Sequence, residues 1–212
     1  MPGAPRKWGP PVALAVVVLL GGAGFARLTQ GFTVWTLDDR RAERVIERRL
    51  QFPPVAARDA QGKAVTLFAP GRAEPVRVQL VTFIYTHCMT VCRALGSEFT
   101  QLQQRIAADG LAGHVGLLSV SIDPERDDSR SLRAYAIDQH AQSSIWRIVA
   151  PASTVTLQHL LRTLDVVAIP DGLGGFEHNG GIHVVDARGR VLAIYDLATF
   201  EQAYAFAQEA AR

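Results

Sequence analysis

The chain has two cysteines, Cys88 and Cys92, and they stand close together in the stretch YTHCMTVC. Two thiols at this spacing form a structural disulfide, a redox-active dithiol or part of a metal site. If a helix begins near Thr90, Cys92 lies in its first turn, where free N–H groups and the helix dipole stabilise the thiolate. Two thiolates do not complete a structural zinc site, which takes four ligands. They do favour Cu(I), for which one further ligand is enough, so the pattern directs attention to histidine.

Most of the histidines in the chain are expected to be structural or exposed. His183 lies inside the strand-like run GIHVVD, so packing is favoured for it. If the strand before Cys88 continues, the ring of His87 points away from the Cys88 side chain, so packing or a supporting role next to the ligands is favoured over ligation. His178 ends the glycine-rich loop segment DGLGGFEHNGG, which brings its ring over the cysteines if it feeds a strand beside theirs; an exposed loop histidine is the alternative. The others lie at the ends of predicted elements or among polar residues: His114, His140 and His159.

From residue 51 onward, apolar runs of strand length alternate with segments of helical periodicity. Buried strands are expected at 75–85, 114–123 and 145–150, hairpins at 57–68 and 180–197, and helices at 90–108, 127–140, 153–164 and 199–211. This order predicts an α/β protein with a mixed central sheet and a thioredoxin-like fold. The cysteines then lie where the first long strand meets its helix. Expected helix caps are Asp128 or Ser129, Ser153 and Thr199.

The N-terminal part predicts an exported protein. Residues 1–10 are interpreted as a cytoplasmic N-terminus, 11–28 as a membrane anchor or signal peptide, 29–50 as a tether with a charged helix, and 51–212 as the thioredoxin-like domain. Arg6 and Lys7 precede the apolar run and are expected to stay inside. This predicts a single-pass protein of a bacterial inner membrane with its soluble domain in the periplasm. In that oxidising compartment a working dithiol must be kept reduced or held by a metal.

Charge and composition argue against nucleic-acid binding but exclude few other functions. The 22 basic and 20 acidic residues nearly balance, and no basic stripe interleaved with aromatic residues is present. The 48% of hydrophobic residues suffices for a packed core. Thr36 and Asp39 have the spacing of a capping box at the start of the charged helix.

Three segments of the chain resemble, in order, the signature blocks of the SCO/SenC copper chaperones: FIYTHCMTVC, LLSVSIDPERDD and EHNGGIHVVDARGRV. The resemblance runs over residues 52–210 and extends to the N-terminal anchor. It implies a membrane-anchored thioredoxin fold that acts in cytochrome c oxidase assembly and binds copper, as Cu(I), Cu(II) or both, through two cysteines and one histidine. In the family that histidine stands eight residues before the aspartate that ends a strand. This spacing, set against Asp186, gives the role to His178.

The chain departs from the family pattern around its cysteines. Prolines usually follow both cysteines and an aspartate often stands between them, whereas this chain has Met89, Arg93 and Thr90. These changes bear on affinity and on Cu(II) more than on Cu(I) binding, and Met89 is either a weak additional ligand or a packed or exposed residue. Asp123 in the second block either starts a turn or supports the site from behind its ligands.

Two functions are compatible with these residues. The first is a metallochaperone, not an enzyme, in which Cys88, Cys92 and His178 hold one copper ion and pass it to subunit II of cytochrome c oxidase or a similar acceptor. The second is a thiol–disulfide oxidoreductase that uses the two cysteines to keep the oxidase's copper-site cysteines reduced. A periplasmic thiol reductant or a copper donor is then a further partner. A peroxidase is disfavoured, since the usual surroundings of a peroxidatic cysteine are missing from the sequence.

Overall fold

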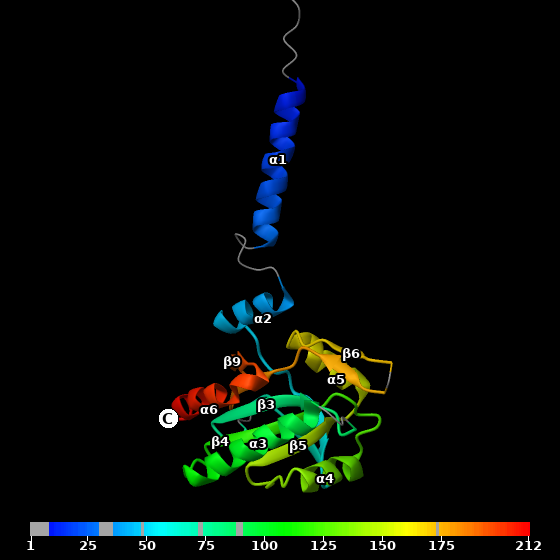
Figure 1. Cartoon of the computed structure of the whole chain (residues 1–212), viewed down its shortest axis with the longest axis vertical. Coiled ribbons are helices and arrows are strands. Elements are labelled where there is room, and N and C mark those ends of the chain that lie inside the picture. The colour runs from blue at the N-terminus through cyan, green and yellow to red at the C-terminus, as the bar shows by residue number, and fades with distance from the viewer. Residues whose placement is uncertain (1–8, 30–35, 48, 72–73, 88–90, 173) are drawn as a thin grey trace, which may run out of the picture. The chain divides into compact units, whose positions relative to one another are not determined.

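The structure, a computed structural model, describes residues 9–29, 36–47, 49–71, 74–87, 91–172 and 174–212, in two units, Met1–Arg40 and Arg41–Arg212. In the first unit, helix α1 (Gly9–Leu28) covers the segment predicted as an anchor or signal (Figure 1). Within the described ranges, no helix combines the length and the apolar character that a membrane crossing needs. Arg6 and Lys7, on which the predicted orientation rests, lie outside the described residues. Helix α2 (Leu37–Ile46) begins with the predicted capping box, since the Thr36 N–H donates to Asp39 and the Asp39 N–H donates to Thr36.

The second unit is built on a seven-stranded sheet in the order β2-β1-β5-β4-β3-β8-β9. The three central strands β3, β4 and β5 run parallel, and the outer strands are antiparallel to their neighbours, which makes the sheet mixed, as predicted. Every residue of β3 and β4 is buried, as the apolar runs indicated. Because parallel strands end at one edge of the sheet, the loops after β3, β4 and β5 lie together there. The strand bounds are β1 Val55–Asp59, β2 Ala64–Leu67, β3 Val78–Ile84, β4 Val115–Ser121, β5 Trp146–Pro151, β8 Ile182–Asp186 and β9 Val191–Tyr195.

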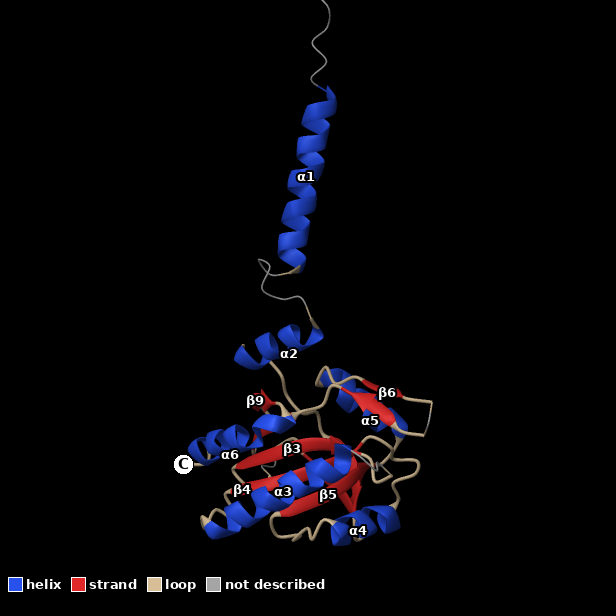
Figure 2. Cartoon of the chain, in the orientation of Figure 1, coloured by secondary structure: helices blue, strands red, loops and turns tan. Residues whose placement is uncertain are grey.

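Helices cover both faces of this sheet (Figures 1 and 2). Helices α3 (Val91–Ala108), α4 (Ser129–Asp138) and α6 (Phe200–Ala210) contribute to one apolar cluster, and α5 (Thr154–Thr163) contributes to the other. Two predicted caps are confirmed: Asp128 accepts the Ser131 N–H at 2.8 Å and Ser153 accepts the Thr156 N–H at 3.1 Å. Thr199 is the N-cap residue of α6, as predicted, but its side chain does not cap the helix, because its hydroxyl donates to the Asp196 carbonyl within a 3₁₀ turn (η1, Leu197–Thr199) that leads into α6.

A small hairpin separate from the main sheet replaces the loop that the sequence predicted around His178. Strands β6 (Ala168–Pro170) and β7 (Phe176–His178) pair antiparallel, with Ala168 opposite His178. The connection is closed by Asp171, whose N–H donates to the Gly175 carbonyl and whose carboxylate accepts the Gly175 N–H at 2.8 Å. The glycines in this segment therefore serve a tight reversal, and His178 stands at the end of a strand instead of in a flexible loop.

Candidate metal centre

The two cysteines mark the start of helix α3. Cys88 lies outside the described residues, as do Met89 and Thr90. Cys92 is the second residue of α3, so its backbone lies in the first helical turn, as predicted; its side chain is not described. The N-terminal end of a helix stabilises negative charge, so this position favours a thiolate at Cys92.

The chain segment leading to Cys88 is fixed by a buried carboxylate. Asp127 is fully buried in the loop between β4 and α4. It accepts the Thr86 N–H at 3.1 Å, the Thr86 hydroxyl at 2.5 Å and the Ser121 hydroxyl at 2.6 Å. Strand β3 ends at Ile84, so these bonds replace the sheet in holding residue 86, two positions before Cys88. No role was predicted for Asp127, whose signal in the sequence is the polar block SIDPERDD after a buried strand.

His87 does not continue the strand. Its ring is exposed, with Nδ1 3.2 Å from the Thr86 hydroxyl oxygen and 3.5 Å from an Asp127 oxygen. The side chain is 55% exposed whereas that of Asp127 is not exposed at all, so the pair is open to water on the histidine side. The exposed ring is not a packing residue, which was one of the two roles predicted for His87, and its approach to Asp127 is compatible with the other, a supporting role.

His178 is the histidine with the environment of a ligand. It is half-buried, and burial lowers its pKa from 6.5, which favours the neutral imidazole that binds metals. Its Nδ1 accepts the Gly180 N–H at 3.1 Å. A neutral imidazole has one acceptor nitrogen, so this bond puts the proton on Nε2. Ligation through either nitrogen therefore requires His178 to give up the Gly180 bond, by release of Nδ1 or by a change of tautomer.

The hairpin that carries His178 packs on the end of β3. The rings of Phe176 and Tyr85 meet edge to face with centroids 5.5 Å apart, and Tyr85 stands three positions before Cys88. The approach is close, because a Cβ on Gly175 would lie 2.8 Å from the Tyr85 hydroxyl oxygen. The Arg126 guanidinium lies over the Phe176 ring, 5.9 Å from its centroid. The structure thus brings the His178 hairpin to the strand end that leads to Cys88, through residues that the sequence interpretation had not singled out.

The remaining histidines have surroundings of a different kind. His183 is completely buried in β8, edge-on to the rings of Phe83 and Phe52 at 5.6 and 6.3 Å. Burial, followed by the charge of Arg41, lowers its pKa from 6.5 to about 3, so it is a neutral core residue, as predicted. The last three are exposed, also as predicted: His114, His140 and His159.

Asp123 starts the predicted turn, whereas no contact of its carboxylate with a proposed metal ligand is seen among the described residues. Its carbonyl accepts the N–H groups of Arg126 and Asp127, which forms the predicted turn. Its carboxylate, 8% exposed, pairs with the Arg126 side chain and not with a histidine. Any influence of Asp123 on His178 therefore passes through Arg126.

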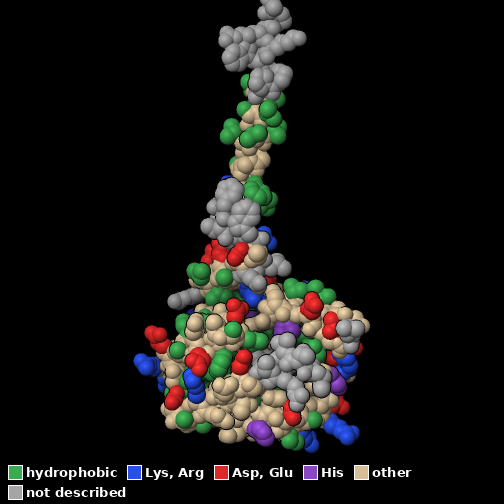
Figure 3. Space-filling model, viewed as in Figure 1, with side chains coloured by type: hydrophobic (Ala, Val, Ile, Leu, Met, Phe, Trp, Pro, Cys, Tyr) green, Lys and Arg blue, Asp and Glu red, His purple; other side chains and the backbone are tan. Residues whose placement is uncertain are grey.

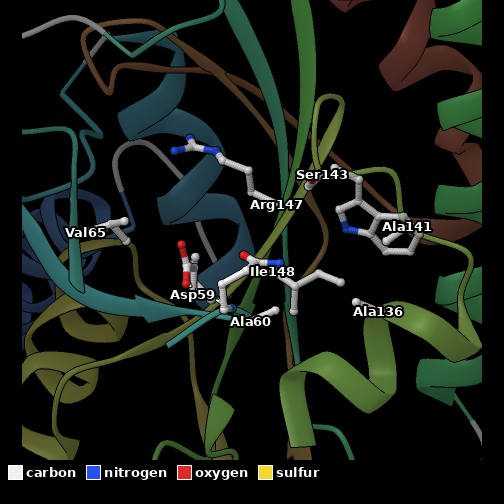
Figure 4. Close-up of a pocket in the computed structure, with 11 residues that line it drawn as sticks. Asp59, Ala60, Val65, Ala136, Ala141, Ser143, Arg147 and Ile148 are labelled. Carbon is white, nitrogen blue, oxygen red and sulfur yellow. Dashed lines mark hydrogen bonds between the residues drawn. The ribbon is translucent and has the colours of Figure 1, made fainter. Parts of the chain in front are cut away.

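Other parts of the described chain do not assemble a second metal site. No group of three His, Cys, Asp or Glu among the described residues has an arrangement that could hold a metal ion, and Cys88 lies outside that set. A cavity of about 170 Å³ opens between β1, β5 and α4, where Arg147 and Asp59 project among apolar side chains (Figure 4). Arg147 is already bonded to Glu74 at 2.6 Å and Gln79 at 3.0 Å. On the face seen in Figure 3, acidic and basic side chains are interspersed.

The strand order, the parallel centre and the cysteine pair at the β3–α3 junction define a thioredoxin-like α/β protein with a site at the carboxyl edge of its sheet. The SCO1/SenC family model matches residues 72–210, so the chain belongs to the SCO1/SenC family, as the three sequence blocks predicted.

Relatives agree in sequence and in fold. A SCO1 protein homolog of Bacillus subtilis (strain 168) is 26% identical over 145 residues, which are 68% of this chain and 72% of the relative. ScoI of Bradyrhizobium japonicum, solved with copper bound, matches with a TM-score of 0.61 and 24% identity over 75% of this chain and 98% of its own. BsSco, a member of the Sco family of cytochrome c oxidase assembly proteins in which a disulfide switch was identified, matches with a TM-score of 0.64 and 21% identity over 76% of this chain and 94% of its own.

Proposed function

We propose that this chain is a copper chaperone that binds one copper ion through Cys88, Cys92 and His178 and delivers it to cytochrome c oxidase during assembly. The observation that carries the proposal is the contact of Phe176 with Tyr85, which puts the hairpin of His178 on the strand end that leads to the cysteines. Family membership supports copper as the bound ion, since ScoI of Bradyrhizobium japonicum was solved with copper bound. Copper is here the cargo, not a resident cofactor.

The proposed donors fit copper. Two thiolates and a neutral imidazole are soft to intermediate ligands, a set that suits Cu(I) and also accepts Cu(II). The helix N-terminus at Cys92 favours its thiolate, and the lowered pKa of His178 favours its neutral ring. A site on a loop and at the end of a short hairpin suits a carrier, because its ligands exchange one at a time with those of an acceptor.

The bond between His178 and Gly180 gives this site a defined metal-free state. With Nδ1 bonded to the Gly180 N–H, the ring has no free lone pair. Copper entry and exit are therefore coupled to the breaking and remaking of one hydrogen bond of ordinary strength, on the order of 1 kcal/mol. Such a bond lowers copper affinity slightly, and the imidazole can form it again after the copper ion has been transferred.

We place the delivery outside the cytoplasm. The apolar run that follows Arg6 and Lys7 supports export, with 11–28 as anchor or signal and subunit II of the oxidase as the proposed acceptor. BsSco belongs to a family of cytochrome c oxidase assembly proteins, which supports the oxidase, though not a particular subunit, as the partner. Fractionation of cells that express the full chain, with and without alkaline carbonate washing, tests the anchor: an anchored chain stays in the membrane pellet, and a cleaved chain is recovered in the periplasmic fraction.

Thiol–disulfide exchange is the second candidate, and the disulfide switch identified in BsSco favours keeping it. Here the Cys88–Cys92 dithiol would reduce a disulfide of the acceptor: one thiolate attacks, a mixed disulfide forms, and the second thiol resolves it. The acceptor gains two electrons and two protons, and this chain is left with the Cys88–Cys92 disulfide. His178 has no part in that reaction, which makes it the discriminating residue.

Anaerobic titration of the reduced protein with Cu(I), together with a thiol count, tests the two candidates. The carrier predicts near-equimolar copper in the wild type and a loss of tight binding in His178→Ala. His159→Ala, which alters an exposed imidazole on α5, is the matched control and should bind like wild type. Equal copper binding by His178→Ala and wild type would exclude His178 as a ligand. Reduction of an acceptor disulfide in the absence of copper would then favour the thiol–disulfide oxidoreductase.

A further inference from the structure

The loop between β4 and α4, residues 122–128, contacts both halves of the proposed metal site. We call it the bracket loop. Its two working side chains are neighbours in sequence, Arg126 and Asp127, and they reach different segments. One contacts the chain just before Cys88 and the other contacts the hairpin of His178. The backbone N–H groups of both residues donate to the Asp123 carbonyl, but their side chains contact different partners, since Asp127 is buried whereas the Arg126 side chain is 44% exposed.

The inner arm of the bracket loop is the carboxylate of Asp127. It takes the N–H and the hydroxyl of Thr86 together with the hydroxyl of Ser121 on β4. Hydrogen bonds to a buried charge are stronger than those between neutral groups, and the loss of such a partner leaves donors unsatisfied. The end of β3 is thereby tied to the end of β4 beyond the last residues that the sheet itself pairs.

The outer arm is the guanidinium of Arg126. Asp123 holds it from one side, and its other side lies over the ring of Phe176, two positions before His178. The backbone of the hairpin is close as well, because a Cβ on Gly174 would lie 3.7 Å from an Arg126 nitrogen. Phe176 is therefore held between Arg126 and Tyr85. A cation above an aromatic ring at such a partly exposed position contributes modestly, but it is directional.

We propose that the bracket loop sets the position of the His178 hairpin relative to the Cys88 segment, with Asp127 and Arg126 as positioning residues for the two halves of the metal site. This proposal rests on the proposed function for its consequence, namely copper affinity. Its physical basis, the two separate arms, holds in the metal-free protein. The two side chains contact different partners, so each can be substituted without replacing the other, and each substitution should disturb mainly one half of the site.

The outer arm is tested with Arg126→Gln against Arg130→Gln, an exposed arginine one turn further along the chain in α4. In the metal-free protein, amide hydrogen exchange in β6 and β7 should become about two- to fivefold faster in Arg126→Gln only. The Cu(I) dissociation constant should rise by a similar factor, about two- to fivefold. Arg126→Lys, which keeps a cation for both Asp123 and Phe176, should recover most of the loss, whereas a merely structural role of the residue predicts no such recovery.

The inner arm is tested with Asp127→Asn against Asp128→Asn, since asparagine caps α4 about as well as aspartate does. Asp127→Asn should weaken copper binding by about tenfold or more. If that variant fails to fold, Thr86→Val removes one of the same bonds without burying a new group. In the Cu(II) form, inner-arm variants should alter the thiolate-to-copper absorption band and spare the nitrogen hyperfine signal of His178, and Arg126→Gln should do the reverse.

The outcomes separate this inference from the proposed function. A wild-type protein that takes up no copper contradicts the proposed function. The amide exchange rates of the hairpin still test whether Arg126 holds the hairpin in position. If amide hydrogen exchange in β6 and β7 is as fast in Arg126→Gln as in wild type, the positioning role of the bracket loop is overturned, whatever the copper affinity. Identical spectral changes in variants of both arms also overturn it, because the two halves would then not be positioned separately.

Discussion

Two histidines five positions apart, His178 and His183, show how strongly the surroundings decide what an imidazole can do. His178 ends the small β6–β7 hairpin and is half-buried, with one nitrogen bonded to a neighbouring backbone N–H. His183 lies in β8, completely buried against two phenylalanine rings. Both are neutral at pH 7 because burial lowers both pKa values, but only the first can offer a nitrogen to a metal without unpacking the core.

The strands on which the two residues lie differ in the same way. Strand β8 is paired on both sides, by β3 and by β9, and its residues from Ile182 to Val185 are buried. The hairpin has two strands of three residues each, and it is paired on one side only. A two-stranded hairpin of this length depends on its side-chain contacts for stability, so the hairpin is expected to open locally at a lower free energy than the sheet. A carrier site benefits from the more mobile element, and a core benefits from the rigid one.

Acid should destabilise the protein through His183 more than through His178. The pKa of His183 is about 3 in the folded protein and near 6.5 in the unfolded chain, so between these values the unfolded chain binds more protons. The free energy of unfolding should then fall by roughly 1.4 kcal/mol per pH unit below pH 6.5, to an accumulated loss on the order of 4 kcal/mol near pH 3. Urea denaturation of wild type and His183→Leu between pH 4 and 8 measures the difference. If the free energies of unfolding of wild type and His183→Leu differ by the same amount at every pH in this range, the low pKa of His183 is contradicted.

Truncation of the two side chains should separate stability from binding. His183→Ala removes a ring packed between Phe52 and Phe83 and should lower the free energy of unfolding by about 2–4 kcal/mol at pH 7, because the rigid sheet cannot collapse into the space. His178→Ala should cost less than about 1 kcal/mol, because the residue is half-buried on a peripheral hairpin. Denaturation curves give both values. A larger loss in His178→Ala than in His183→Ala would reverse the comparison.

Patterns in the sequence predicted the elements that are long and buried. The β3 and β4 runs and the helices α3 to α6 lie within a few residues of their predicted positions, because hydrophobic periodicity and caps such as Ser153 are local signals. The hairpin escaped prediction because strands of three residues are too short for a period to show. Its glycines were interpreted as a flexible loop, whereas they allow the tight turn closed by Asp171.

The candidate site was predicted as a set of residues but not as an arrangement. Cys88, Cys92 and His178 follow from donor chemistry and from the resemblance of the motifs. The residues that hold the surrounding segments, Asp127 and Arg126, do not, because their roles depend on contacts with Thr86 and Phe176 that are distant in sequence. A polar block after a buried strand indicates a loop at the sheet edge, and only the fold shows which segments that loop reaches.

Gly181 lies on the core side of the boundary between the two regions. A Cβ at this position would lie 2.5 Å from the Tyr195 carbonyl oxygen, which belongs to β9 and cannot move without the strand. Gly181→Ala should therefore lower the free energy of unfolding by about 1–3 kcal/mol through overpacking, with the first effect on the pairing of β8 with β9. Thermal or urea denaturation measures the loss. If the variant is as stable as wild type, β9 can shift to accommodate the added Cβ more easily than its burial indicates.

An alanine at Gly180, one position earlier, should affect copper affinity more than stability, the reverse of the effect expected at Gly181. A Cβ there would lie 2.5 Å from Nδ1 of His178 and 2.9 Å from Cε1, so the obstacle is the far end of a side chain that can rotate. Gly180→Ala should cost less than about 0.5 kcal/mol of stability, the range of substitutions outside the core. It should displace the imidazole from its bond with the Gly180 N–H and raise copper affinity by about threefold or more, since that bond competes with the metal and is worth on the order of 1 kcal/mol. Copper titration and denaturation of Gly180→Ala and Gly181→Ala side by side make the test: if adjacent glycines give the same pair of effects, the hairpin and the sheet do not behave as separate regions.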